Sequence, residues 1–177
     1  MTDQGTYLED GLALITKEAF TPMPWKNGLG VTQQIYVHED AEGVRFRISQ
    51  AAVVKDGIFS DFAGLERTLV LLSDTGITLS HQHDQQHYSH QLQQALDMAT
   101  FSGADSTFAK LHQGAIEDLN IMVRDKDSQA QVKACYGPCV LHPTTSSPAF
   151  LRAFYAHQDC ELSTSKKTHP IAQGSFV

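Results

Sequence analysis

The stretch Val44-Arg45-Phe46-Arg47-Ile48-Ser49 alternates strictly between apolar and polar side chains. Successive residues of a strand point to opposite faces of a sheet, so this period of two predicts a strand with one apolar and one polar face. The stretch Asp118-Leu119-Asn120-Ile121-Met122-Val123-Arg124 repeats the pattern. Both stretches therefore favour an all-β fold.

Short strand candidates recur along the rest of the chain, at 12–16, 32–37, 68–72, 76–79, 108–111, 131–134, 139–141 and 150–156. Turn signals such as Asn27-Gly28 and Gly137-Pro138 separate them. Many short strands with turns between them are typical of a β-sandwich or barrel. The best helical window, 89–98, lacks a clear apolar stripe, so we expect at most short helices.

The chain has 177 residues, of which 41% are hydrophobic, as is usual for one soluble globular domain. No repeat or low-complexity linker divides it. The least patterned stretch, 82–98, is predicted to be a joint or insertion. The last stretch, 163–177, has few core residues and is predicted to be a frayed tail.

Charge and hydropathy exclude several partners. Thirteen basic and 20 acidic residues give a net charge of −7, so we expect no binding to nucleic acid. No apolar run approaches the roughly 20 residues that cross a bilayer, and the first ten residues lack a secretory signal. The chain is therefore predicted to be cytoplasmic, with Cys135, Cys139 and Cys160 as thiols.

The segment 23–32 contains the single tryptophan, Trp25, together with Lys26, Asn27, Gly28 and Gly30. Glycines allow close backbone approach to a ligand, while an ammonium and an amide suit an anionic group. The alternative interpretation is a tight hairpin in which Trp25 fills the core.

A second cluster, 56–67, has two aromatic residues and ends at Arg67, just before a buried strand candidate. An arginine at the rim of such a strand needs a partner. Asp61, Asp118 or the carboxylate of a ligand could supply it, and the sequence leaves these alternatives open.

Four motifs follow one another along the chain: Pro24-Trp25-Lys26-Asn27-Gly28-x-Gly30-x-Thr32, Arg47-x-Ser49-x-Ala51, Gly57-x-Phe59-Ser60-x-Phe62-x-Gly64-x-x-Arg67 and Asp118-Leu119-Asn120-x-Met122-x-Arg124. Together they resemble the HutD/Ves family over roughly residues 12–141. The resemblance implies a cupin-type β-barrel or sandwich, and specifically a double cupin (bicupin) that forms one compact domain over residues 1–177. Leu29 departs from the pattern, since the family commonly has a third glycine there, so the ligand could differ.

The resemblance also implies a function. Members of the family look like small-molecule-binding or regulatory proteins, and some are encoded beside histidine-utilisation genes. We therefore expect a non-enzymatic regulator of histidine degradation that binds formylglutamate, formiminoglutamate or urocanate in a polar barrel pocket, without a cofactor. The implied ligand-binding residues are Lys26, Asn27, Thr32, Arg47, Ser49, Ser60, Arg67, Asp118, Asn120 and Met122.

The alternation supports such a pocket independently. Arg47 and Ser49 share one strand face, and Asp118, Asn120 and Met122 share another. If both faces line a barrel interior, they suit a small anion such as a dicarboxylate with an amide-like group. The alternative is that these faces are exposed to solvent.

A rival site is the run from His81 to His90, which contains four of the nine histidines. His81, His83 and His87 resemble the metal-binding pattern of cupins, with His87 in place of the usual glutamate. They would bind Zn, Fe or Mn in a metal-dependent isomerase or dioxygenase. The alternative is a hydrated loop. The sequence also leaves open whether the chain forms homo-oligomers.

Overall fold

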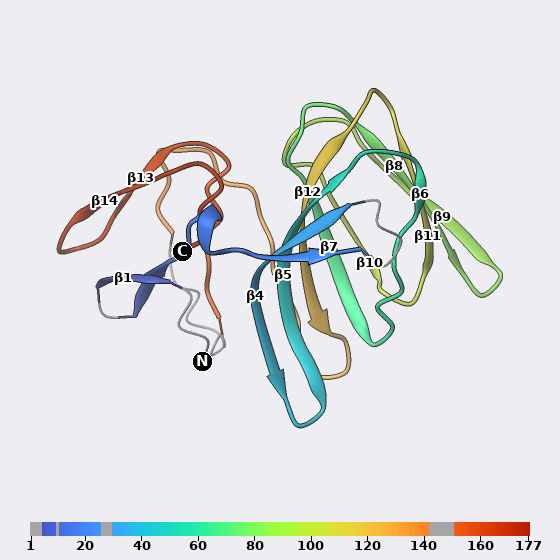
Figure 1. Ribbon diagram of the computed structural model, residues 1–177, viewed down its shortest axis with the longest axis horizontal. Coiled ribbons are helices and arrows are strands. Elements are labelled where there is room, and N and C mark those ends of the chain that lie inside the picture. The colour runs from blue at the N-terminus through green and yellow to red at the C-terminus, as the bar shows by residue number, and fades with distance from the viewer. Residues whose placement is uncertain (1–4, 10, 26–29, 142–150) are drawn as a thin grey trace. The chain divides into compact units, whose positions relative to one another are not determined.

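The structure is a computed structural model, and it describes residues 5–9, 11–25, 30–141 and 151–177 (Figure 1). Its contacts divide the chain into two compact units, Thr21–Val132 and a second that combines Met1–Phe20 with Lys133–Val177. Apart from one short 3₁₀ turn, η1 (Lys17–Ala19), every regular element in the described residues is a strand. The predicted all-β fold is confirmed.

The unit Thr21–Val132 contains a six-stranded antiparallel sheet in the order β10-β7-β12-β5-β4-β3. Its strands are β3 (Thr21–Pro24), β4 (Val31–Asp40), β5 (Gly43–Val53), β7 (Leu65–Leu71), β10 (Met98–Ser102) and β12 (Ile116–Arg124). The two alternating stretches of the sequence lie in β5 and β12, which are direct neighbours.

A four-stranded antiparallel sheet in the order β6-β11-β8-β9 completes this unit. Its strands are β6 (Gly57–Ile58), β8 (Ile77–His83), β9 (Gln86–Leu92) and β11 (Ser106–Leu111). One apolar core contains side chains from both sheets, such as Leu69 and Leu71 of β7 with Ile77 and Leu79 of β8. The sheets therefore pack face to face as a β-sandwich.

The backbone of Gly103 closely approaches the segment between β6 and β7 and holds it in place. Gly103 accepts a hydrogen bond from the Phe62 amide and donates one to the Leu65 carbonyl, at 2.9 and 2.7 Å. A Cβ at Gly103 would lie 2.3 Å from the Phe62 carbonyl oxygen, so only glycine fits there. This contact fixes the backbone on either side of Phe62.

Arg124, at the end of β12, joins that strand to the turn between β4 and β5. Its Nη1 and Nη2 donate to the carboxylate of Asp40 at 2.8 and 2.6 Å, and its Nε and Nη2 donate to Asp127. The side chain is almost fully buried. Arg124 is therefore already satisfied by protein carboxylates.

The second unit contains two antiparallel pairs: β1 (Thr6–Glu9) with β2 (Leu12–Leu14), and β13 (Cys160–Ser163) with β14 (Thr168–Ile171). Ile15 forms a bridge with Phe176, and the two residues exchange backbone hydrogen bonds of 2.7 and 2.9 Å. This bridge joins the two ends of the described chain within one unit.

Several details differ from the sequence predictions. Residues 82–98 do not form a joint between units, because most of them belong to β8 and β9 of the sandwich and the units divide at residues 20–21 and 132–133. Residues 163–177 are not a frayed tail, because β14 pairs with β13 and Phe176 is buried. The segments 131–134 and 139–141 form no strand, and 89–92 is strand rather than helix.

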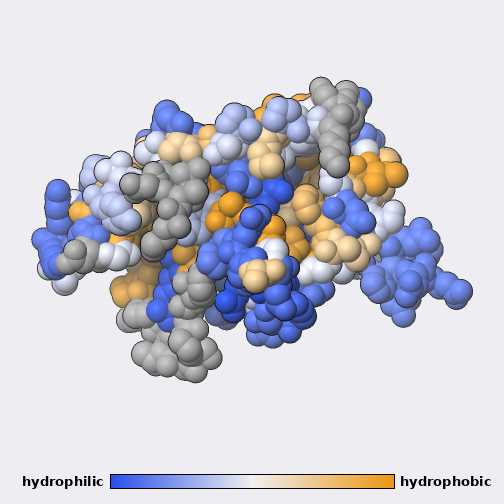
Figure 2. Space-filling view, turned by 60° about the horizontal axis from the view of Figure 1, so that its bottom comes forward, coloured by the Kyte–Doolittle hydropathy of each residue, from blue (hydrophilic) through white to orange (hydrophobic). Residues whose placement is uncertain are grey.

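On the face that Figure 2 presents, hydrophobic side chains are interspersed with hydrophilic ones. No helix in the described residues is long and apolar enough to cross a membrane.

Candidate functional site

Polar side chains lie in adjacent rows on the inner face of the six-stranded sheet. The strand register places Arg47, Met122, Arg67 and Phe101 across one row, Ser49, Asn120, Leu69 and Ala99 across the next, and Thr32, Ala51, Asp118 and Leu71 across the third. Residues in register on neighbouring strands point to the same face. The polar faces of β5 and β12 therefore lie together inside the sandwich, with Ser49 and Asp118 each 1% exposed.

Arg67 is the central cation of this site. It is 4% exposed, and its guanidinium carbon lies 5.2, 5.2 and 5.1 Å from the ring centroids of Phe59, Phe62 and Phe101. Its Nη2 donates to Asn120 Oδ1 at 2.8 Å. Its Nε is buried and has no hydrogen-bond partner among the described residues.

Arg47 is a second, half-buried cation beside the first. Its Nη2 lies 3.3 Å from the Met23 sulfur, its guanidinium lies over the Phe62 ring at 5.7 Å, and its Nε is another buried donor without a partner in the described part of the chain. Burial lowers the pKa of Arg67 to about 10, and the positive charge of Arg47 adds to that shift while Asp118 opposes it. Both side chains remain cations at neutral pH.

Asp118 is the only carboxylate in these three rows. Burial raises its pKa to about 7; the positive charge of Arg67 opposes this shift and the neighbouring Glu117 adds to it. Asn120 lies between the two groups, since its amide donates to Asp118 Oδ1 and its oxygen accepts from Arg67. The carboxyl is thus only partly ionised at neutral pH, which leaves this region with net positive charge.

The other predicted ligand residues occupy different positions. Lys26 and Asn27 lie outside the described residues. Thr32 Oγ1 accepts a hydrogen bond of 2.8 Å from the Trp25 indole, so its hydroxyl supports that ring. Ser60 is exposed, and only its backbone oxygen lies near Arg67, at 3.5 Å from Nη1.

The opposite wall of this end of the sandwich carries a hydrogen-bonded histidine pair. His81 is 2% exposed, and its Nδ1 lies 2.9 Å from Thr107 Oγ1 and its Nε2 lies 3.0 Å from His90 Nδ1. Because the Thr107 hydroxyl donates to the backbone oxygen of Asp105, it accepts from His81 Nδ1. Burial and His90 lower the pKa of His81 to about 4, so the ring is neutral.

Phe101 connects the two walls. Its ring lies 4.5 Å from the His81 ring and 5.1 Å from the Arg67 guanidinium. The candidate site is therefore a positively charged end of the sandwich interior with aromatic sides, and it suits a small anion with a planar or apolar flank.

The histidines predicted as an alternative metal site do not converge. His87 pairs with Gln82 across the β8–β9 hairpin, so it points to the face opposite His81 and His83. His83 Nδ1 instead pairs with Asp105 at 2.6 Å, and Tyr88 donates to the other oxygen of the same carboxylate. Among the described residues, no three His, Cys, Asp or Glu side chains are arranged to hold a metal ion.

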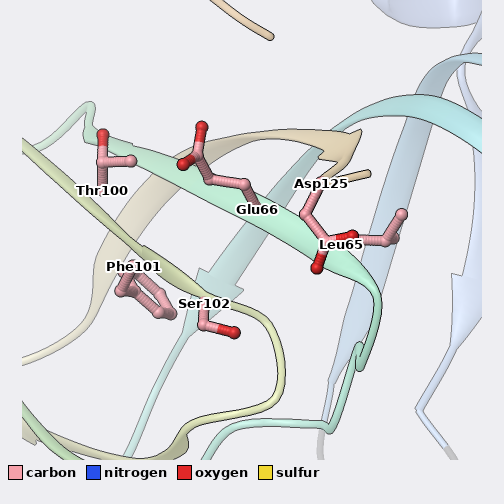
Figure 3. Close-up of a pocket in the computed structure, with 6 residues that line it drawn as sticks. All are labelled: Leu65, Glu66, Thr100, Phe101, Ser102 and Asp125. Carbon is pink, nitrogen blue, oxygen red and sulfur yellow. The ribbon is translucent and has the colours of Figure 1, made fainter. Parts of the chain in front are cut away.

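Two surface recesses are lined by neither Arg67 nor Arg47. One, of about 600 Å³, is formed at the tip of the β8–β9 hairpin by His83, Asp84, Gln85 and Gln86. The other, of about 230 Å³, is lined by Leu65, Glu66, Thr100, Phe101, Ser102 and Asp125 (Figure 3). Figure 3 shows Glu66 and Thr100 on one side of the β7–β10 pair and Phe101 turned to the other. Two carboxylates make this second recess unfavourable for an anion.

Sequence reasoning missed Phe101 and Thr107 as parts of the site, and it named His90 only as the end of the histidine run. Phe101 lies opposite Arg67 only because β10 pairs with β7 in this register, and no local pattern reveals that pairing. Phe59 and Phe62 carried a signal, since they stand in the motif that ends at Arg67.

Comparisons with known proteins agree with this architecture. The chain is 30% identical over 154 residues to the uncharacterized 21.2 kDa protein in the hutC 3′ region of Pseudomonas putida. This alignment covers 86% of this chain and 78% of the relative. It is 34% identical over 111 residues to Protein Ves of Escherichia fergusonii, covering 62% of this chain and 56% of that protein.

Among solved structures, HutD from Pseudomonas fluorescens SBW25 superposes with a TM-score of 0.69 at 21% identity, over 92% of this chain and 84% of that one. A conserved protein of unknown function from Pseudomonas aeruginosa PAO1 gives a TM-score of 0.53 at 32% identity, over 63% and 55% of the two chains. These likenesses and the sandwich itself confirm the predicted cupin-type fold. The HutD family model matches residues 17–177, and the chain belongs to the HutD/Ves family.

Proposed function

We propose that this protein binds a small anionic intermediate of histidine degradation and acts as a non-enzymatic regulator of that pathway. The observation that carries the proposal is the buried Arg67, whose Nε donor has no partner in the described residues, while the carboxyl of Asp118, which interacts with it electrostatically, is only partly ionised. A carboxylate of the ligand would satisfy this donor, and a buried charge-assisted hydrogen bond is strong.

The surroundings of Arg67 support this choice of ligand. The side chain of Arg47 supplies a second cation whose Nε has no partner among the described residues, which suits a ligand with two carboxylates or one shared carboxylate. Three phenylalanine rings around Arg67 exclude water and strengthen the attraction between opposite charges. Formylglutamate, formiminoglutamate and urocanate all carry a carboxylate next to a planar group.

A regulatory role fits the family better than catalysis. The relative in P. putida is named for its position beside hutC, which links the family to a histidine-utilisation locus. Both ring nitrogens of His81, the neutral histidine of this interior, are already hydrogen-bonded to Thr107 and His90, which supports binding without turnover.

The experiment is a thermal-shift screen of metal-stripped protein against formylglutamate, formiminoglutamate, urocanate, glutamate and histidine, repeated with Zn, Fe and Mn. A ligand at about 100 times its Kd adds roughly 2.7 kcal/mol to stability. For a chain of this length, that corresponds to a rise in Tm of roughly 5 to 11 °C. We expect such a rise with at least one pathway intermediate.

Matched variants locate the binding. Arg67→Gln and Arg47→Gln should abolish the rise, whereas Arg45→Gln should keep it. Arg45 shares the face and strand of Arg47, but its Nε donates to Ser128. If Arg67→Gln fails to fold, the half-buried Arg47 still tests the site. A rise with metal alone that disappears in His81→Ala would contradict the proposal and favour the metal-enzyme alternative.

A further inference from the structure

Asp118, Asn120 and Arg67 form a continuous buried chain of hydrogen bonds. Asp118 and Asn120 are two residues apart on β12 and point to the same face, and Arg67 reaches Asn120 from the neighbouring β7. The amide is held in one orientation, because its oxygen can only accept from the guanidinium and its nitrogen can only donate to the carboxyl. Asn120 therefore connects the candidate anion site to a buried acid.

The acid at the end of this chain is well placed to change its protonation state. Asp118 is 1% exposed, so an ionised form there depends on nearby positive charge rather than on water. Burial raises its pKa to about 7, with Arg67 opposing the shift. Loss of the positive field of Arg67 would therefore favour the protonated form.

We propose that binding of a carboxylate at Arg67 is coupled to uptake of a proton by Asp118, with Asn120 as the connecting residue. The inference rests on the proposed function, since it needs an anion at Arg67. The bound anion neutralises the guanidinium and brings a further negative charge close to Asp118. The free energy of ionising Asp118 is then higher, so the carboxyl takes up a proton from solvent.

This coupling makes anion binding depend on pH in a defined direction. Below the pKa of free Asp118, the carboxyl is protonated with and without ligand, so affinity does not vary. Between this pKa and the higher pKa of the ligand-bound form, binding takes up a proton, so affinity falls as pH rises; above both pKa values the affinity levels off. A rise of one unit in the pKa of Asp118 on binding corresponds to roughly a tenfold change in affinity.

Other ionisable groups lie on the strands of the sandwich and on the loop between β10 and β11. They are Arg47 on β5, the exposed Glu117 on β12, His81 and His83 on β8, Tyr88 and His90 on β9, and Asp105 between β10 and β11. The pKa of His81 is lowered to about 4 and that of Tyr88 is raised to about 12, while hydrogen bonds to Tyr88 and His83 help to lower the pKa of Asp105. These three groups therefore do not titrate between pH 6 and roughly 8.5.

The test uses formate as the probe, because it is the smallest carboxylate and is fully ionised across this pH range. Two NMR signals are followed in the full-length chain at constant ionic strength: the Nε–H resonance of Arg67 and the side-chain carboxyl carbon of Asp118. We expect formate to shift the Arg67 signal and to move the titration of Asp118 to higher pH by about one unit. Formate affinity should be roughly tenfold weaker at pH 8.5 than at pH 6.

Two variants identify the group responsible. Asp118→Asn keeps an acceptor for Asn120 and should bind formate with no pH dependence. Glu117→Gln removes the neighbouring exposed carboxylate, and it should keep the pH dependence. If the pH dependence persists in Asp118→Asn, a histidine or another group carries it and the inference is overturned.

The outcomes separate the two proposals. A shift of the Arg67 signal without any change in the Asp118 titration overturns the proton coupling and leaves the anion site intact. No shift of the Arg67 signal at any pH overturns the anion site, and the coupling with it.

Discussion

Asp118 and Arg67 show how burial changes the chemistry of two ordinary ionisable residues. Both lie in the sandwich interior, where burial disfavours the charged form of each and their mutual attraction favours it. Burial dominates for the carboxyl, whose pKa rises so that it becomes a weaker acid than an exposed aspartate. The guanidinium stays charged because its pKa starts far above neutrality.

The substitution Asp118→Asn is expected to stabilise the protein at neutral pH. Since the pKa of Asp118 is raised from 3.8 to about 7 in the folded chain, the folded state holds a proton that the unfolded state has lost between these values. Stability of the wild type therefore falls as pH rises from about 4 to about 7, by on the order of 4 kcal/mol.

Thermal unfolding of the wild type and of Asp118→Asn between pH 4 and 8 measures this effect. The two Tm values should agree near pH 4 and diverge in favour of the variant as pH approaches 7. Glu117→Gln is the control for removing an acid at an exposed neighbouring position. A difference between Asp118→Asn and wild type that is the same at every pH would show that Asp118 does not titrate in this range.

Ser49 shows which part of a residue's environment the sequence does not predict. The alternation in 44–49 correctly separates Phe46 and Ile48 from Arg47 and Ser49. It does not reveal that Ser49, on the polar face, points into the sandwich and is 1% exposed. Periodicity gives the two faces of a strand, and only the packing of the other sheet decides which face is inside.

At the level of elements, Arg124 fastens the end of β12 to the β4–β5 hairpin. The substitution Arg124→Gln should lower Tm by several degrees, because it leaves the carboxylates of Asp40 and Asp127 without their shared partner. The loss should persist at high salt, since the guanidinium is almost fully buried and therefore poorly screened.

The matched control is Lys126→Gln, which removes only the exposed ion pair with Glu42 and should leave Tm nearly unchanged. Thermal unfolding at low and high salt measures both. Equal effects of the two substitutions would show that Arg124 acts as an ordinary surface charge.

The β8–β9 hairpin explains why the metal prediction from the sequence does not match the structure. The spacing of His81, His83 and His87 suggests three ligands, but a two-residue turn at Asp84-Gln85 places His87 opposite Gln82. Asp84 adopts a φ of 52°, which asparagine and aspartate tolerate in tight turns. A turn one residue longer or shorter would have put His87 on the other face, and the sequence alone does not fix that length.

At the level of the whole molecule, the fold class could be predicted from the strand pattern, but the division into units could not. Residues near both ends combine into one unit because Ile15 and Phe176 bridge across more than 150 positions of sequence. No local signal marks such a pairing. The short stretches 131–134 and 139–141 resemble strands in sequence, yet the structure gives them no neighbouring strand to pair with.

Hydrogen exchange should reflect this organisation. Amides of β5, β7 and β12 should exchange slowly, because each of these strands has a paired neighbour on both sides. Residues 133–141, which take no part in any described strand, should exchange much faster. Exchange in 133–141 as slow as in β12 would contradict the described organisation and would place these residues in a stable sheet.

We propose that Arg67 binds a ligand carboxylate. A crystal structure of the protein soaked with formylglutamate tests this proposal most directly. We expect a carboxylate within hydrogen-bonding distance of Arg67 Nε, with the ligand against the phenylalanine rings. Formylglutamate bound at the β8–β9 hairpin, or a saturated crystal in which Arg67 contacts only protein, would contradict it.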